Sequence, residues 1–258
     1  MNIKSNFPAV FSLKRELAVI TGGGTGIGQA IAIAMHMAGA RVVLVGRREE
    51  LLAKAVKEMG KGAAFVRHDI TKLDGAEALI QQITREHGPV TCLINNAGIH
   101  LKKSAVDTTV EEFQDVLSTH ILGAHALNRA VIPGMTERKH GSILFIASMA
   151  SLFGIPLVVA YSSAKTAMLG MVRTLSTELS QHGVRVNAVA PGWIDTEMSR
   201  KAFAGDPARK SKILSRTPMQ KLGDVSDVGW AAVYLASPAA KFVTGAILPV
   251  DGGVSMGF

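Results

Sequence analysis

LAVITGGGTGIG, residues 17–28, is the stretch that decides the fold of this 258-residue chain. Its first five residues, Leu17–Thr21, are apolar and partly β-branched without polar alternation, which predicts a strand buried on both faces of a parallel sheet. Five glycines fall within the next seven positions, 22 to 28. The segment Gln29–Ala40 that follows is rich in Ala, Ile and Met and predicts a helix.

A strand, a glycine-rich turn and a helix N-terminus, in this order, predict a binding site for an anion. Glycine lets the backbone turn sharply and come close to a pyrophosphate, while the free N–H groups and the dipole of the helix favour negative charge. The pattern therefore indicates a dinucleotide site, and the alternative is a turn that holds no ligand. The phosphate loop of nucleoside triphosphatases is excluded, because no Gly-Lys-Ser/Thr follows.

The charge, aromatic content and cysteine count of the chain indicate which classes of partner and site are expected. The chain has 28 Lys and Arg against 20 Asp and Glu, a net charge of +8 that favours anionic partners such as phosphates or acidic metabolites. Nucleic-acid binding is not expected, because the charges are scattered and only 5% of the residues are aromatic. Cys92 is the only cysteine, so we expect no intrachain disulfide, no cysteine-built zinc site and a cytoplasmic protein. The uncharged stretch 141–164 is broken by serines, glycine and proline, so no membrane span is predicted.

Strands and helices are predicted to alternate along the whole chain. This alternation predicts an α/β fold of the doubly wound (Rossmann) type, with one parallel sheet, helices on both faces and a single domain. Ligands of such folds bind at the carboxyl ends of the strands, near the point where the strand order reverses. Further strands are expected at 41–45, 63–66, 90–94, 142–147, 184–189 and 247–250, and helices at 49–59, 73–87, 110–136 (one long helix or two pieces), 160–181 and 226–235.

Several short motifs together resemble the short-chain dehydrogenase/reductase family, and within it the 3-oxoacyl reductases and the sugar-acid and polyol dehydrogenases. They occur in the family's order and cover nearly the whole chain, from about residue 11 to residue 253. The resemblance implies a seven-stranded sheet, a nicotinamide cofactor, no metal, a homotetramer, and a substrate lid over 195–222 within the domain 1–258. The motifs are Thr21-Gly22-x-x-x-Gly26-Ile27-Gly28, Asn95-Asn96-Ala97-Gly98, Ser148, Tyr161-x-x-x-Lys165, Asn187, Pro191-Gly192 and Asp251-Gly252-Gly253.

Tyr161, Lys165 and Ser148 are the expected catalytic residues. Tyr161 and Lys165 are four apart at the start of a predicted helix, so their side chains share one face. An ammonium group beside a phenol favours the phenolate and is expected to lower the tyrosine pKa from its reference of about 10. Such a phenol exchanges a proton with an alcohol or ketone oxygen while hydride moves, and the Ser148 hydroxyl holds the same oxygen. The alternative is an ordinary, partly exposed helical pair.

His120 stands where the family usually has an asparagine that completes the catalytic group. In the family that asparagine bends its helix and holds a water that relays protons to the lysine. An imidazole with a reference pKa near about 6.5 also carries protons at neutral pH, so a relay through His120 would add an ionisation near neutrality to the pH–rate profile. The alternative is a histidine that fills the space structurally.

The end of the second strand indicates the cofactor. An acidic residue there binds the ribose hydroxyls of NAD, whereas arginine accommodates the extra phosphate of NADP. This chain has Gly46 followed by Arg47 and Arg48, which favours NADP (NADPH), although both arginines are also compatible with a solvated helix start. By resemblance, the other cofactor-binding residues are Gly22, Gly24, Thr25, Gly26, Ile27, Gly28, Asp69, Ile70, Asn96, Ala97, Gly98, Tyr161, Lys165, Pro191, Gly192, Ile194 and Thr196.

The sequence thus predicts an NADP-dependent oxidoreductase that transfers a hydride between nicotinamide and a ketone or secondary alcohol. The substrate is expected to be of the 3-oxoacyl thioester or the sugar-acid/polyol type. Two other hypotheses stand beside it: a catalytically weak, nucleotide-sensing regulator of the same fold, and a structural oligomer or nucleic-acid binder that only the net charge favours.

Overall fold

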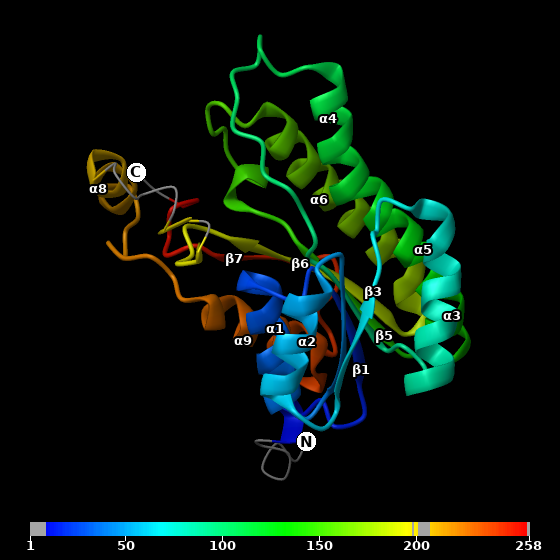
Figure 1. Cartoon of the computed structure of the whole chain (residues 1–258). Coiled ribbons are helices and arrows are strands. Elements are labelled where there is room, and N and C mark those ends of the chain that lie inside the picture. The colour runs from blue at the N-terminus through cyan, green and yellow to red at the C-terminus, as the bar shows by residue number, and fades with distance from the viewer. Residues whose placement is uncertain (1–8, 198, 201–206, 257–258) are drawn as a thin grey trace.

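The computed structural model describes residues 9–197, 199–200 and 207–256 (Figure 1). These residues form a seven-stranded parallel sheet in the order β3-β2-β1-β4-β5-β6-β7, which confirms the doubly wound prediction. The strands are β1 (Leu17–Thr21), β2 (Arg41–Gly46), β3 (Ala63–Arg67), β4 (Cys92–Asn95), β5 (Gly141–Ile146), β6 (Val184–Pro191) and β7 (Ile247–Val250).

Helices cover both faces of the sheet, with α1, α2 and α9 on one side and α3, α5 and α6 on the other (Figure 1). The described helices are α1 (Gly26–Met37), α2 (Glu49–Met59), α3 (Ala76–His87), α4 (Val110–Leu117), α5 (Gly123–Glu137), α6 (Val159–Leu179), α8 (Pro207–Ser215) and α9 (Val225–Ala236). No helix in the described ranges is long and apolar enough to span a bilayer.

The apolar run of β1 is explained by the two cores that it separates. Because successive side chains of a strand point to opposite faces, Leu17 and Val19 pack into the core under α3, α5 and α6. Ala18 and Ile20 pack into the other core, under α1, α2 and α9. All five residues of β1 are buried, so a strand in the middle of this sheet tolerates no polar alternation.

The strand order reverses between β1 and β4, which pair in parallel although β2 and β3 separate them in sequence. The turn after β1 and the segment after β4 therefore lie next to each other. Asn96 fixes this junction, because its Nδ2 donates to the carbonyl of Thr21 at 2.8 Å. The Thr21 hydroxyl in turn accepts the backbone N–H groups of Asn96 and Ala97, both at 3.0 Å. The expected ligand edge is thus built from the glycine turn and the Asn95–Gly98 motif.

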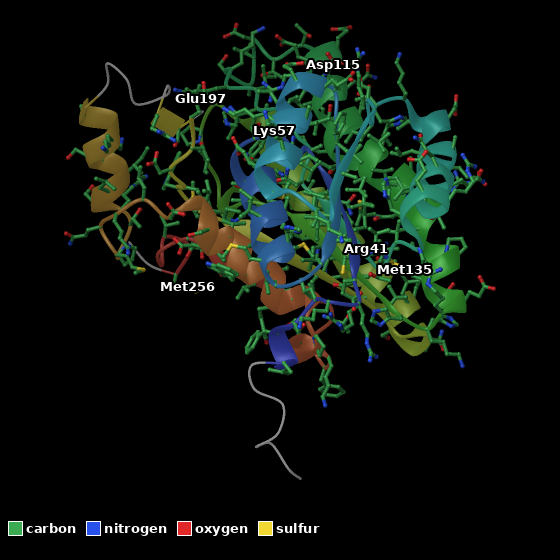
Figure 2. All side chains as sticks on the ribbon, turned by 60° about the horizontal axis from the view of Figure 1, so that its bottom comes forward. Arg41, Lys57, Asp115, Met135, Glu197 and Met256 are labelled. Carbon is green, nitrogen blue, oxygen red and sulfur yellow. The ribbon has the colours of Figure 1, made fainter. Side chains whose placement is uncertain are left out.

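Helix α1 begins at Gly26, three residues before the predicted start. Gly26 and Gly28 belong to its first turn, so part of the glycine-rich stretch is helical rather than loop. The predicted lid, 195–222, contains α8 and an ion pair between Asp195 and Arg200 at 3.2 Å. Residues 198 and 201–206 of that segment lie outside the described residues. Glu197, which is labelled in Figure 2, belongs to the same segment, and this segment follows β6 in the chain.

Candidate active site

The glycine turn is open where a pyrophosphate would approach and closely packed elsewhere. Gly22 and Gly26 adopt left-handed backbone angles, with φ of 65° and 57°. A Cβ on Gly26 would meet no atom within 4 Å, whereas a Cβ on Gly28 would lie 2.3 Å from the carbonyl oxygen of Gly22. Helix α1 has no side-chain cap at Thr25 and no acidic residue in its first turn. Its N–H groups are therefore suited to an anion, and the turn fits the dinucleotide prediction.

Ser148 and Tyr161 meet at the carboxyl edge of the sheet. Ser148 follows β5 and caps a short 3₁₀ helix, where its hydroxyl accepts the N–H of Ala150 at 3.1 Å. Tyr161 lies in the first turn of α6, and its phenol is near enough to the Ser148 hydroxyl for their interaction to favour the phenolate. The two hydroxyls that were expected to hold one substrate oxygen are therefore brought together.

Lys165 lies one turn further along α6 and is buried, with 4% of its surface exposed. Its Nζ donates to the carbonyl of Ile146 at 2.5 Å and lies 5.6 Å from the centroid of the Tyr161 ring. Burial lowers the pKa of Lys165 to about 7, so at neutral pH its charge is easily gained or lost. The ammonium group is therefore held beside the phenol without touching it.

The expected lowering of the tyrosine pKa is wrong for this structure. Burial raises the pKa of Tyr161, and the interaction with Ser148 only partly offsets this. The reason is that removal of the ring oxygen from water disfavours the phenolate more than the neighbouring groups favour it. The phenol is therefore protonated at neutral pH, which is the form that donates a proton to a ketone oxygen.

His120 lies in a π-helical segment, Ser118–Leu122, between α4 and α5. Its Nε2 is 2.8 Å from the carbonyl oxygen and 3.1 Å from the backbone nitrogen of Ile99, and its ring meets the Tyr161 ring edge-on at a centroid distance of 5.6 Å. Burial, followed by the charge of Lys165, lowers the pKa of His120 to about 3. This lowered pKa argues against the ionisation near neutrality that the relay alternative predicts, because a buried imidazole beside a cation stays neutral. The contacts with Ile99 favour the structural alternative.

The adenosine end of the predicted cofactor site lies at the ends of β2 and β3. Arg48 donates through Nη2 to the hydroxyl of Thr25 at 3.3 Å, which holds it beside the glycine turn. Asp69 accepts the N–H and the hydroxyl of Thr71 at 3.1 and 2.8 Å. Burial raises the pKa of Asp69, but these hydrogen bonds and the Arg47 charge outweigh it, so the pKa is lowered and the carboxyl stays ionised. Arg47 and Asp69 line one open pocket, as expected of neighbouring cofactor-binding residues.

The remaining predicted cofactor residues have mainly backbone contacts. Ile70 is 7% exposed and packs in the core. Gly192 is closely packed, because a Cβ there would lie 2.6 Å from Cα of Asp251. Ile194 forms a bridge with Gly223, and the hydroxyl of Thr196 accepts the N–H of Ser199 at 3.1 Å. Gly192, Ile194 and Thr196 therefore lie in the segment that follows β6, whose last residue, Pro191, is buried.

Local sequence reasoning missed the side chains that the end of β3 contributes to this edge. Arg67 and His68 line the pocket with Arg47 and Asp69, and the register of the β2–β3 pair would have revealed them. The ring of His100 lies 4.9 Å from the ring of Tyr161, centroid to centroid, which places it at the mouth of the candidate active site.

The chain is similar to known proteins over nearly its whole length. Residues 22–255 match the family model described as enoyl-(acyl carrier protein) reductase. The chain is 37% identical to the NADP-dependent (R)-specific alcohol dehydrogenase of Lentilactobacillus kefiri, over 93% of this chain and 97% of that protein. It is 32% identical to the 3-oxoacyl-[acyl-carrier-protein] reductase of Vibrio cholerae, over 95% and 99%.

A similar fold is found among solved structures. The gluconate 5-dehydrogenase of Burkholderia cenocepacia, in complex with NADP and tartrate, superposes with a TM-score of 0.92 at 30% identity, over 96% of this chain and 98% of that chain. The model match, the relatives and the shared fold lead to one conclusion: the chain belongs to the short-chain dehydrogenase/reductase family, whose members act on CH–OH or keto groups.

Proposed function

We propose that this protein is an NADP-dependent oxidoreductase that transfers a hydride between nicotinamide and a ketone or secondary alcohol. The observation that carries the proposal is that Ser148 and Tyr161 come together, with Lys165 near the Tyr161 ring, at the carboxyl edge of the sheet that also holds the open glycine turn. We propose substrates of the 3-oxoacyl thioester or sugar-acid/polyol type, and assembly as a homotetramer. Relatives and a solved neighbour with such names support these classes.

In this proposal the residues divide the chemistry between them. The hydroxyls of Ser148 and Tyr161 bind the substrate oxygen, and the protonated phenol donates its proton to that oxygen during ketone reduction. NADPH, when bound, supplies the hydride. Lys165 would hold the nicotinamide ribose, as the family resemblance implies, and its charge stabilises the phenolate that remains after proton transfer. His120 positions Ile99, at the segment that follows β4, rather than transferring the proton itself.

The glycine turn supports dinucleotide binding, and the residues after β2 support the choice of NADP. Gly46 places no carboxylate where the 2′-phosphate would lie, and Arg47 and Arg48 follow it. The N–H groups at the start of α1 and the left-handed Gly26 would hold the pyrophosphate. The cofactor that the fold implies is therefore compatible with the residues present.

A spectrophotometric screen tests the proposal. NADPH oxidation is followed with 3-oxoacyl thioesters, 5-ketogluconate and simple diketones, and NADPH affinity is measured separately by fluorescence titration. We expect turnover with at least one of these ketones. Tight NADPH binding without turnover of any of them would favour the nucleotide-sensing regulator, because such a protein needs the glycine turn but not the proton donor.

A further inference from the structure

β2 and β3 end side by side, and the last residue of β3 is an arginine. The register of the pair sets Gly46, at the end of β2, opposite Arg67, at the end of β3. A Cβ at position 46 would contact only the Leu52 side chain, at 3.5 Å. Gly46 therefore adds no bulk between Arg67 and the arginine loop that follows β2.

Arg67 shares an open pocket of about 520 Å³ with Arg47, His68 and Asp69. Its side chain is 69% exposed, and Nη1 lies 3.9 Å from Oε2 of Glu49, which is itself exposed at the first turn of α2. Such an exposed pair at this distance contributes little free energy. The guanidinium group of Arg67 is therefore available to a stronger anion.

The chemistry of the pocket selects a phosphate group. Two guanidinium groups offer planar pairs of N–H donors that match phosphate oxygens. The carboxylate of Asp69 already accepts two hydrogen bonds from Thr71, so it is held by its own loop. Nε2 of His68 is buried and has no hydrogen-bond partner among the described residues. The carboxylates of Asp69 and Glu49 both oppose an anion here, and Glu49 is the one that contacts Arg67 directly.

We infer that Arg67 is a specificity-determining residue that binds the 2′-phosphate of the adenosine together with Arg47. This inference rests on the proposed use of NADP. It adds a cation from β3 to the arginines that follow β2, and it assigns Glu49 a defined role. Glu49 competes with the phosphate for Arg67, so removal of its charge strengthens phosphate binding.

Binding of nucleotide fragments to the ligand-free protein tests the inference without any turnover. Isothermal titration calorimetry compares adenosine 2′,5′-bisphosphate with 5′-AMP, because the two differ only by the 2′-phosphate. The variants are Arg67→Ala and Glu49→Gln. Lys57→Ala is the matched control, since Lys57 (labelled in Figure 2) lies in the last turn of α2, whereas Glu49 lies in the first turn.

Arg67→Ala and Glu49→Gln are expected to change the affinity for the bisphosphate in opposite directions. Arg67→Ala weakens binding of the bisphosphate about tenfold, the loss of about one charge-assisted hydrogen bond, and leaves 5′-AMP unchanged. Glu49→Gln tightens bisphosphate binding by about two- to fivefold, as removal of one opposing exposed charge allows. Lys57→Ala changes neither affinity.

The contrary outcomes separate the two proposals. A wild-type protein that prefers the bisphosphate, with an unchanged affinity in Arg67→Ala, would overturn the role of Arg67 but keep the NADP preference. An equal loss for both nucleotides in Arg67→Ala would likewise overturn it, because the effect would then not depend on the 2′-phosphate. A wild-type protein that binds both nucleotides equally would overturn the inference and the NADP preference together.

Discussion

The imidazole of His120 occupies the space that a side chain on Gly98 would fill. A Cβ on Gly98 would lie 2.2 Å from Cε1 of His120, closer than any two such atoms come. The two residues lie 22 positions apart in sequence, one after β4 and the other in the π-helical segment. The imidazole of His120 therefore packs against the backbone of the Asn95–Gly98 motif and leaves no room for a side chain at position 98.

We expect Gly98→Ala to destabilise the protein through this contact. The added methyl would run into the buried imidazole of His120, and such overpacking costs about 1–3 kcal/mol of the free energy of unfolding. The double variant Gly98→Ala/His120→Ala should recover part of the loss that Gly98→Ala causes, since the imidazole no longer meets the methyl. Urea unfolding of both single variants and the double variant gives the coupling energy. Strictly additive losses would show that the two side chains do not compete for the same space.

The pH–rate profile should not contain an ionisation of His120. Its pKa, lowered to about 3 by burial and by Lys165, lies well below the working range, so the ring is neutral throughout. We expect kcat/KM of His120→Asn to follow the same pH dependence as the wild type between about pH 5 and 9. A limb near neutrality that disappears in His120→Asn would instead establish a proton relay through the charged imidazole.

An ion pair between an exposed histidine and a buried glutamate, near the amino ends of the strands, should make stability depend on pH. Nε2 of His140 lies 3.0 Å from Oε2 of Glu16, and the hydrogen bond to Glu16 raises the pKa of His140 above 6.5. Burial raises the pKa of Glu16, but hydrogen bonds from His140 and Thr91 outweigh it, so the pKa falls below 4.5.

His140 and Glu16 contribute to the free energy of unfolding over different pH ranges, because the pKa of one is raised and the pKa of the other is lowered. The stability from His140 is complete below pH 6.5 and is lost as the pH rises through its raised pKa. The stability from Glu16 is complete above pH 4.5 and is lost as the pH falls through its lowered pKa. His140→Gln should therefore destabilise the protein by about 0.5–1 kcal/mol near pH 5.5, a value reduced for the exposure of the imidazole, and by less near pH 9. An equal loss at both pH values in thermal unfolding would contradict the ion pair.

Gly46→Asp should reverse the cofactor preference. The backbone of Gly46 is not left-handed and a Cβ there meets only Leu52, so the side chain has room. A carboxylate at this position repels the 2′-phosphate and accepts the ribose hydroxyls of NADH, so KM for NADPH should rise at least about tenfold while KM for NADH falls. Gly46→Ala is the control, because it adds the Cβ without the charge. A similar change of KM in Gly46→Asp and Gly46→Ala would show that the added bulk, and not the negative charge, alters cofactor binding.

The parts of the fold that depend on local pattern could be predicted from the sequence. β1, α2 and β7 have the predicted bounds, because an apolar run or an amphipathic period ends there at glycine or polar residues. The start of α1 was placed three residues late, since glycine usually breaks a helix and here opens one. The π-helical segment around His120 was not predicted, because one extra residue in a helical turn leaves the apolar period almost intact.

The placement of the candidate site residues on shared elements could also be predicted, but not their electrostatics. Spacing places Tyr161 and Lys165 on one face, yet it contains no information about how deeply either group is buried, and burial decides the direction of both pKa shifts. Arg67 was missed for a related reason. Its proximity to Gly46 comes from pairing between two strands, which the residues around either position do not reveal.

The central claim is that the phenol of Tyr161 donates the proton to the substrate oxygen. The most direct measurement is kcat/KM of Tyr161→Phe with an active ketone, with NADPH affinity measured on the same preparation. Tyr234→Phe is the control, because Tyr234 is the only other tyrosine and lies on α9. We predict a loss of about 10²–10⁴-fold in kcat/KM for Tyr161→Phe, with NADPH affinity retained and Tyr234→Phe unaffected. Turnover by Tyr161→Phe at a rate comparable to the wild type would contradict the account.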